Sequence, residues 1–197
     1  MLLRPVAAPA ILIALTSTAF AHTGPGDASG LAHGFMHPIG ALDHVLAMVA
    51  VGLYAATLRG RALWLVPAAF LGAMVLGGAA GVAGVPLPYV EVAIALSVVL
   101  LGLAVGLRVG FPMAVAATLA ALFAVFHGHA HGAEMPPDVP GYAYAAGFTL
   151  ATALLHGAGI ALGLLAGTFG ERSGWRFAQA AGGAMALAGI AMLAGVA

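Results

Sequence analysis

The run His37-Pro38-Ile39-Gly40-Ala41-Leu42-Asp43-His44-Val45-Leu46-Ala47-Met48 places two histidines and an aspartate at the start of an otherwise apolar segment. The segment continues to Leu58 and is long enough to cross a bilayer. An ionisable side chain inside a membrane costs about 2.5–3.5 kcal/mol on insertion scales unless it has a partner. Because imidazole and carboxylate donors together suit a divalent metal, this run predicts a cation site within a membrane protein.

The composition of the whole chain excludes a water-soluble domain. Of its 197 residues, 63% are hydrophobic and 6% are charged, whereas soluble domains carry about 25% charged residues. The expected partner is therefore a lipid bilayer. The net charge is zero, so nothing in the charge balance indicates a nucleic-acid partner. The chain has no cysteine, which excludes disulfides, thiolate metal sites and iron–sulfur centres. We expect no prosthetic group.

Residues 1–21 have the features of a cleavable signal peptide. Arg4 is followed by an apolar stretch, and Ala19-Phe20-Ala21 fits a cleavage site. Cleavage would make His22 the first residue of a periplasmic N-terminal segment over 22–37. The alternative is that residues 1–21 form a first transmembrane helix.

Six apolar segments follow, and each is close to the roughly 17–25 residues that span a membrane, although the fourth is short. They predict an all-α membrane protein in which residues 38–197 form a compact bundle of six transmembrane helices. Glycines recur every fourth residue at Gly102, Gly106 and Gly110 and again at Gly159, Gly163 and Gly167, a spacing that lets helix backbones approach closely. The segments are 38–58, 62–83, 88–107, 112–127, 142–168 and 175–196.

The arginines predict the orientation of the bundle. All five that follow the signal peptide fall in alternate connections of the six-helix layout, which the positive-inside rule assigns to the cytoplasm. Most histidines fall on the opposite side. We therefore expect a multi-pass protein of the bacterial cytoplasmic membrane, with the mature N-terminus and a His-rich loop in the periplasm. The five arginines are Arg59, Arg61, Arg108, Arg172 and Arg176.

His37, Asp43 and His44 are the first candidate metal ligands. In one continuous helix, His37 and His44 would share a face, and Asp43 would point about 100° away from His44. Asp43 then either binds the ion directly or accepts the second ring N–H of a ligating histidine. The structural alternative is that Asp43 and His44 pair with each other or with the backbone. We favour a cation site, because ionisable groups in membranes mark functional positions.

Glu91 and His156 are two further candidates. Glu91 lies in the first turn of the third segment, where the helix dipole alone can explain a carboxylate. The functional alternative is a second acidic ligand near the outer mouth. His156 lies deep in the fifth segment beside Thr152 and Gly159. A hydrogen bond to a backbone carbonyl would explain it structurally, but we favour a ligand or relay role.

The stretch His127-Gly128-His129-Ala130-His131, followed by Glu134 and Asp138, predicts a His-rich outer loop that captures metal. His127, His129, His131 and Glu134 are therefore weaker candidate ligands. His22 and His33 are further capture candidates, and His33 is equally consistent with an ordinary solvated residue.

The run HPIGALDHVLAMVAVG, over residues 37–52, resembles the signature of the HupE/UreJ family of nickel and cobalt permeases. Residues 88–97, with Glu91 and Ser97, and residues 147–157, with Thr152 and His156, are also similar to this family. The resemblance implies uptake of Ni²⁺, with Co²⁺ as the second candidate, to supply hydrogenase or urease. It also implies that the ion is handled by His37, Asp43, His44, Glu91 and His156.

The chain contains no Walker A sequence, so we expect transport without ATP hydrolysis by the chain itself. An inside-negative potential supplies about 2 × 2.3, or 4.6, kcal/mol per 100 mV for a divalent cation moving inward. Proton coupling and homo-oligomerisation are left open by the sequence. We expect a permease and not an enzyme; the alternatives are an intramembrane zinc-dependent hydrolase and a membrane metallochaperone or sensor.

Overall fold

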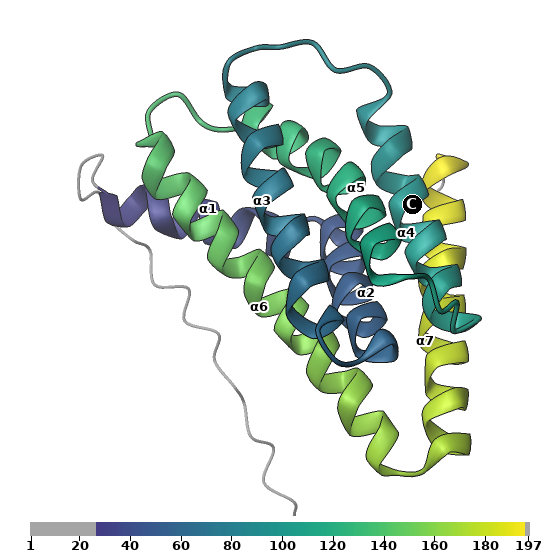
Figure 1. The fold of residues 1–197 in the computed structure, drawn as a ribbon. Coiled ribbons are helices and arrows are strands. Elements are labelled where there is room, and N and C mark those ends of the chain that lie inside the picture. Colours follow the sequence, from purple (N-terminus) through teal and green to yellow (C-terminus); the bar gives the residue numbers. More distant parts are fainter. Residues whose placement is uncertain (1–26, 196–197) are drawn as a thin grey trace, which may run out of the picture.

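The computed structural model describes residues 27–195, which form seven helices and no strand (Figure 1). The predicted all-helical class is therefore confirmed for this part of the chain. The predicted signal peptide and His22 lie outside the described residues. The helices are α1 (Asp27–Gly40), α2 (Leu42–Leu58), α3 (Ala62–Val82), α4 (Val90–Gly106), α5 (Met113–Ala133), α6 (Gly141–Thr168) and α7 (Glu171–Leu193).

Four of these helices, α3, α5, α6 and α7, are long and apolar enough to cross a membrane, and α1 with α2 gives a fifth span if the bent pair is counted as one. The chain is therefore a multi-pass membrane protein. The predicted number of six spans stays a prediction, because α2 and α4 have only 17 residues each. At 1.5 Å per residue, such a helix covers about 26 Å of a hydrocarbon core about 30 Å thick.

The predicted transmembrane segment over 38–58 is not one continuous helix. Helix α1 runs through Pro38 to Gly40, the backbone at Ala41 is extended (φ −98°, ψ 110°), and α2 begins at Leu42. The two helices meet at a bend of 83°. Pro38 cannot donate the intrahelical hydrogen bond and Gly40 is a poor helix former, so the helix ends within one turn of the proline. His37 and His44 thus belong to different helices, and most of the predicted N-terminal segment is helical.

Glycines bring the helices of the bundle into backbone contact. A Cβ atom at Gly128 of α5 would overlap the carbonyl oxygen of Met74 in α3, and one at Gly159 of α6 would overlap that of Val49 in α2. Gly102 of α4 packs in the same way against Gly182 of α7. In lipid, where apolar side chains gain little by meeting one another, such close backbone packing holds helices together. Of the predicted glycine runs, Gly102, Gly159 and Gly163 lie at helix contacts, whereas Gly110 faces open space.

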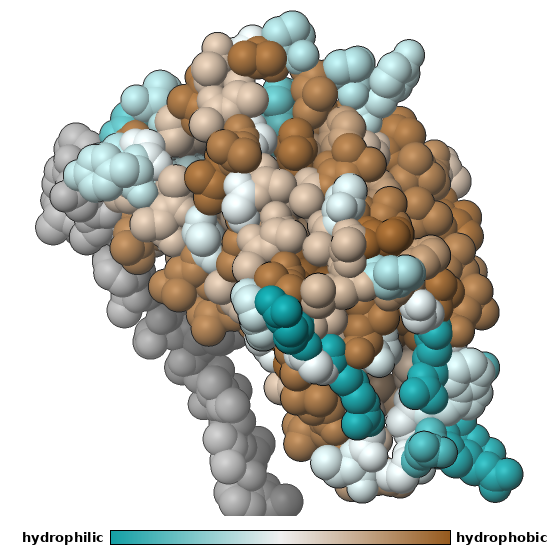
Figure 2. All heavy atoms as spheres, in the orientation of Figure 1, coloured by the Kyte–Doolittle hydropathy of each residue, from teal (hydrophilic) through white to brown (hydrophobic). Residues whose placement is uncertain are grey.

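The two ends of the bundle differ in charge. The connections after α2, α4 and α6 lie at one end, and the connections after α3 and α5 lie at the other (Figure 1). The arginines of the described residues sit in the first set of connections and in the first two turns of α7. Figure 2 shows strongly hydrophilic side chains at the lower end of the view and apolar side chains over most of the middle. We call this lower end the arginine end, and the opposite end, where α1 lies, the histidine end.

Two glycines of α6 give a matched test of this packing. Gly159→Ala forces a methyl group into the α2 backbone, whereas Gly157→Ala places one where no atom lies within 4 Å. We expect Gly159→Ala to destabilise the protein by about 1–3 kcal/mol, as overpacked cores do. Gly157→Ala should be neutral or slightly stabilising, because alanine is the better helix former. Thermal unfolding of the purified proteins in one detergent measures the difference; equal melting temperatures would contradict this account.

Candidate metal site

Helix α5 carries two histidines into the interior of the bundle. The prediction that residues 127–131 form a loop is wrong, because α5 continues to Ala133 and the next proline is Pro136. His127 and His131 are therefore one turn apart on the buried face of α5, in line with Ala120 and Ala124. His129 lies on a different face, where its Nε2 donates a hydrogen bond to the Val85 carbonyl (2.7 Å).

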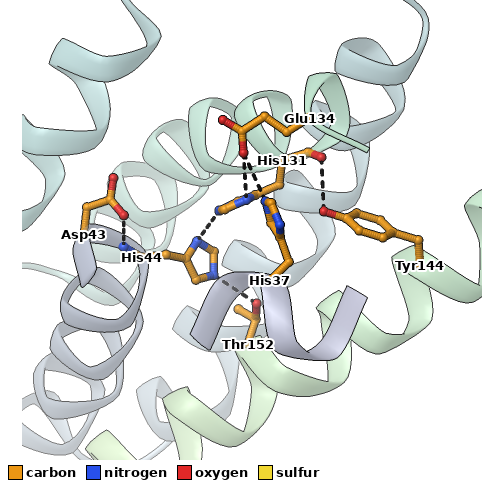
Figure 3. Close-up of polar contacts among 7 residues, drawn as sticks. All are labelled: His37, Asp43, His44, His131, Glu134, Tyr144 and Thr152. Atoms are coloured by element: carbon orange, nitrogen blue, oxygen red, sulfur yellow. Dashed lines mark hydrogen bonds and ion pairs between the residues drawn. The ribbon is translucent and has the colours of Figure 1, made fainter. Parts of the chain in front are cut away.

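The outermost group joins His37 at the end of α1, His131 of α5 and Glu134 just after α5 (Figure 3). His37 Nε2 donates to Glu134 Oε2 at 3.0 Å, and His131 Nδ1 lies 3.8 Å from the same oxygen. Each of the three side chains offers one donor atom within 4.8 Å of the other two. Donors on one transition-metal ion at about 2.1 Å lie roughly 3.0–3.5 Å apart. Small side-chain movements would therefore let an ion replace the proton between His37 and Glu134.

This group is accessible from the histidine end. A pocket of about 490 Å³ is lined by His33, His37, Glu134 and Tyr144, among others. The side chain of Glu134 is 58% exposed and that of His37 is 33% exposed, whereas that of His131 is only 8% exposed. A hydrated cation can thus meet the carboxylate first and the buried imidazole last.

The next imidazole inward is His44, in the first turn of α2. Its Nδ1 lies 3.0 Å from His131 Nε2, and its own Nε2 lies 3.2 Å from the hydroxyl of Thr152 in α6 (Figure 3). In the tautomer in which His131 Nε2–H donates to His44, His131 Nδ1 keeps its lone pair and faces Glu134. A bare ring nitrogen is what a metal ion needs. The hydrogen bond to His44 thus orients the buried ligand of the outer group.

His127 follows His44 and presents an unpaired nitrogen. The two rings are 5.2 Å apart between centroids. The Ser97 hydroxyl donates to the Ile94 carbonyl (2.6 Å), so it must accept from His127 Nε2–H (2.9 Å). His127 Nδ1 is then a lone pair, buried and without a hydrogen bond among the described residues.

His156 of α6 is the deepest member of the series. Its side chain is 1% exposed, and neither ring nitrogen has a hydrogen-bond partner among the described residues. Phe70 lies edge-on to His156 at 5.2 Å and packs against His127 at 5.9 Å, so its phenyl ring contacts both imidazoles. A buried polar group without a partner costs about 1–3 kcal/mol. Both ring nitrogens of His156 are therefore available to a ligand.

The remaining candidates lie outside this series of imidazoles, which runs from His37 through His131, His44 and His127 to His156. Asp43 is half-buried, and its Oδ1 accepts the backbone N–H of His44 (2.6 Å) on the side of His44 away from His131 (Figure 3). Glu91 is exposed in the first turn of α4. His33 lines the outer pocket, and Asp138 is exposed in the connection after α5.

Sequence reasoning assigned no role to three residues that shape the series. Ser97 accepts a hydrogen bond from His127, Phe70 packs against His127 and His156, and Tyr144 donates to the His131 carbonyl (3.4 Å). A serine within an apolar helix is a signal for Ser97. Phe70 gave no signal, because a phenylalanine in a transmembrane segment is ordinary.

His131 and His129 provide a matched pair for metal binding. His131→Ala removes the buried donor of the outer group, so Ni²⁺ affinity should fall at least about tenfold. His129→Ala removes an imidazole only two residues away that faces the Val85 carbonyl, so affinity should change less than about twofold. Isothermal titration of Ni²⁺ into each purified protein gives both values. Equal losses in the two variants would exclude the outer group as the site.

Comparison with known proteins agrees with the sequence resemblance. Residues 10–192 match the family described as HupE / UreJ protein. The protein HupE of Rhizobium leguminosarum bv. viciae is 50% identical over 183 residues, which cover 93% of this chain and 94% of that relative. No solved structure matches the chain. The chain belongs to the HupE/UreJ family.

Proposed function

We propose that this protein is a permease that takes up Ni²⁺, with Co²⁺ as the second candidate, without hydrolysing ATP. The observation that carries the proposal is the series of five imidazoles that leads from the exposed His37 to the buried His156. Three of its members have buried ring nitrogens without hydrogen-bond partners among the described residues. Neutral nitrogen donors suit late first-row metals better than Mg²⁺ or Ca²⁺. Membership in the HupE/UreJ family is consistent with such transport.

The proposed route begins in the outer pocket. Glu134 and His37 attract the hydrated ion, and His131 replaces part of its water shell. The ion then passes His44 and His127 and moves past Phe70 to His156. From there it leaves at the arginine end. Glu134 supplies a carboxylate at the entrance of the route. The inner donors of the series are neutral imidazoles, so they bind the ion without a fixed negative charge that would retain it.

We further propose that all six helices from α2 to α7 span the cytoplasmic membrane, with α1 lying across the outer mouth. The arginine end then faces the cytoplasm, as the positive-inside rule requires. The histidine end faces the periplasm, and the membrane potential drives the cation inward. The imported metal would supply hydrogenase or urease.

Flux into proteoliposomes tests the function directly. Wild-type protein should carry ⁶³Ni²⁺ into vesicles that have an inside-negative potential, and His44→Ala should reduce the initial rate at least tenfold because it breaks the series. His129→Ala is the control and should retain at least half of the rate. A metallochaperone would retain nickel without moving it, and a hydrolase would show no flux. Either result would reject the permease.

Two substitutions of Asp43 distinguish direct ligation of the metal ion from positioning of His44. Its carboxylate holds the backbone N–H of His44 and points away from His131. Asparagine can accept the same hydrogen bond, so Asp43→Asn should keep at least half of the flux, whereas Asp43→Ala should lose most of it. If both variants lose flux equally, the negative charge itself contacts the ion. Reconstitution of equal amounts of folded protein controls for yield.

A further inference from the structure

The arginine end contains a second polar pocket, about 90 Å³ in volume, between the ends of α2, α4 and α6 and the start of α7. Two arginines from different connections line it, Arg59 after α2 and Arg108 after α4. Glu171 and Trp175 of α7 line it as well. One water needs about 10–15 Å³ of such space, so the pocket has room for a small polar group.

Both guanidinium groups are free to bind an anion. Among the described residues, neither Arg59 nor Arg108 forms an ion pair, and both side chains are exposed. Trp175 packs against Arg108, whose Cζ lies 5.6 Å from the ring centroid. With two guanidiniums and the single carboxylate of Glu171, the charged side chains of the pocket sum to one positive charge.

The backbone at both arginines is one that glycine would adopt more easily. Arg59 has φ 62° and Arg108 has φ 51°. Gly84 and Gly170 have a positive φ at other helix ends, and Gly60 has one directly after Arg59. A basic side chain in the preceding turn would offset the helix dipole without this strain. Strained positions cluster at functional sites, and of the three described non-glycine residues with positive φ, Arg59, Tyr89 and Arg108, the two arginines line the pocket.

The tryptophans indicate the depth of the pocket in the membrane. The chain has two tryptophans, Trp64 and Trp175, and each lies against an arginine at this end. Tryptophan is enriched at the membrane–water interface, the level of the lipid headgroups. Anionic lipids of the cytoplasmic leaflet supply phosphate groups at that level.

We propose that Arg59 and Arg108 bind the phosphate group of an anionic phospholipid in this pocket. Arg108 is held in place by Trp175, Arg59 closes the pocket from the α2 side, and Glu171 limits the affinity by repulsion. The inference does not depend on metal transport, because the pocket shares no residue with the imidazole series. A bound phosphate would neutralise the arginine end below His156.

Native mass spectrometry of the purified protein with phosphatidylglycerol or phosphatidylcholine tests the proposal. Phosphatidylglycerol should be retained preferentially, and Arg59→Gln or Arg108→Gln should each lower its retention at least about fivefold, the effect of one basic residue near an anionic surface. Arg61→Gln is the matched control, since Arg61 stacks on Trp64 at 5.7 Å but does not line the pocket. Retention of phosphatidylglycerol by Arg61→Gln should stay within about twofold of wild type. Glu171→Gln should increase this retention.

Two further experiments are informative. One distinguishes loss of lipid binding from loss of protein stability, and the other distinguishes a lipid ligand from free phosphate. Arg59→Gly relieves the backbone strain, so it should lose the lipid while its melting temperature stays equal or rises. Inorganic phosphate at millimolar concentration should not displace the lipid. The proposal is overturned by equal retention of the two lipids, by equal effects of the Arg61 and Arg59 substitutions, or by binding of free phosphate without a preference for phosphatidylglycerol.

Discussion

The backbone contact between α2 and α6 is the constraint on which the rest of the structure depends. A Cβ atom at Gly52 would overlap the carbonyl oxygen of His156, and one at Gly159 would overlap that of Val49. With no side chains between them, the two backbones hold His44 and Thr152 within hydrogen-bond distance. Helix α1 packs on α6 in the same way at Gly34 and Gly147, which places His37 above the same interface. Close packing thus determines where the imidazoles lie.

In the imidazole series, the stability of the bundle and the availability of lone pairs for a cation oppose each other. Burying ring nitrogens without partners weakens the bundle, and the compact helix pairs around them offset that cost. Full hydrogen bonding of every ring would stabilise the bundle but would leave no lone pair for a cation. His127 shows the compromise, because Ser97 satisfies one nitrogen and leaves the other free. The permease that we propose depends on this incomplete satisfaction.

The two ends of the bundle have opposite chemistry. The histidine end offers a carboxylate and imidazoles that attract a cation, and the arginine end offers guanidiniums that repel one. A cation that moves between them therefore gains attraction at entry and meets a barrier at exit. In our proposal, the membrane potential drives the ion across that barrier, and a phosphate bound between Arg59 and Arg108 lowers it.

The sequence by itself determined the properties that depend on composition and local pattern. Its apolar segments required membrane helices, its arginines marked one end of the bundle, and its motifs identified the HupE/UreJ family. Most candidate ligands were also predicted, because histidines in apolar segments are conspicuous. These inferences succeed since bilayer thickness and charge placement act on each segment separately.

Only the tertiary structure decided which of these residues meet. The break at Ala41 placed His37 and His44 on different helices, so their spacing in the sequence no longer predicted a shared face. The extension of α5 turned an expected loop into the buried face that presents His127 and His131. Asp43 turned toward its own helix N-terminus. Each outcome depends on contacts between segments distant in the chain, where a proline, a glycine or a neighbouring backbone sets the direction of a side chain.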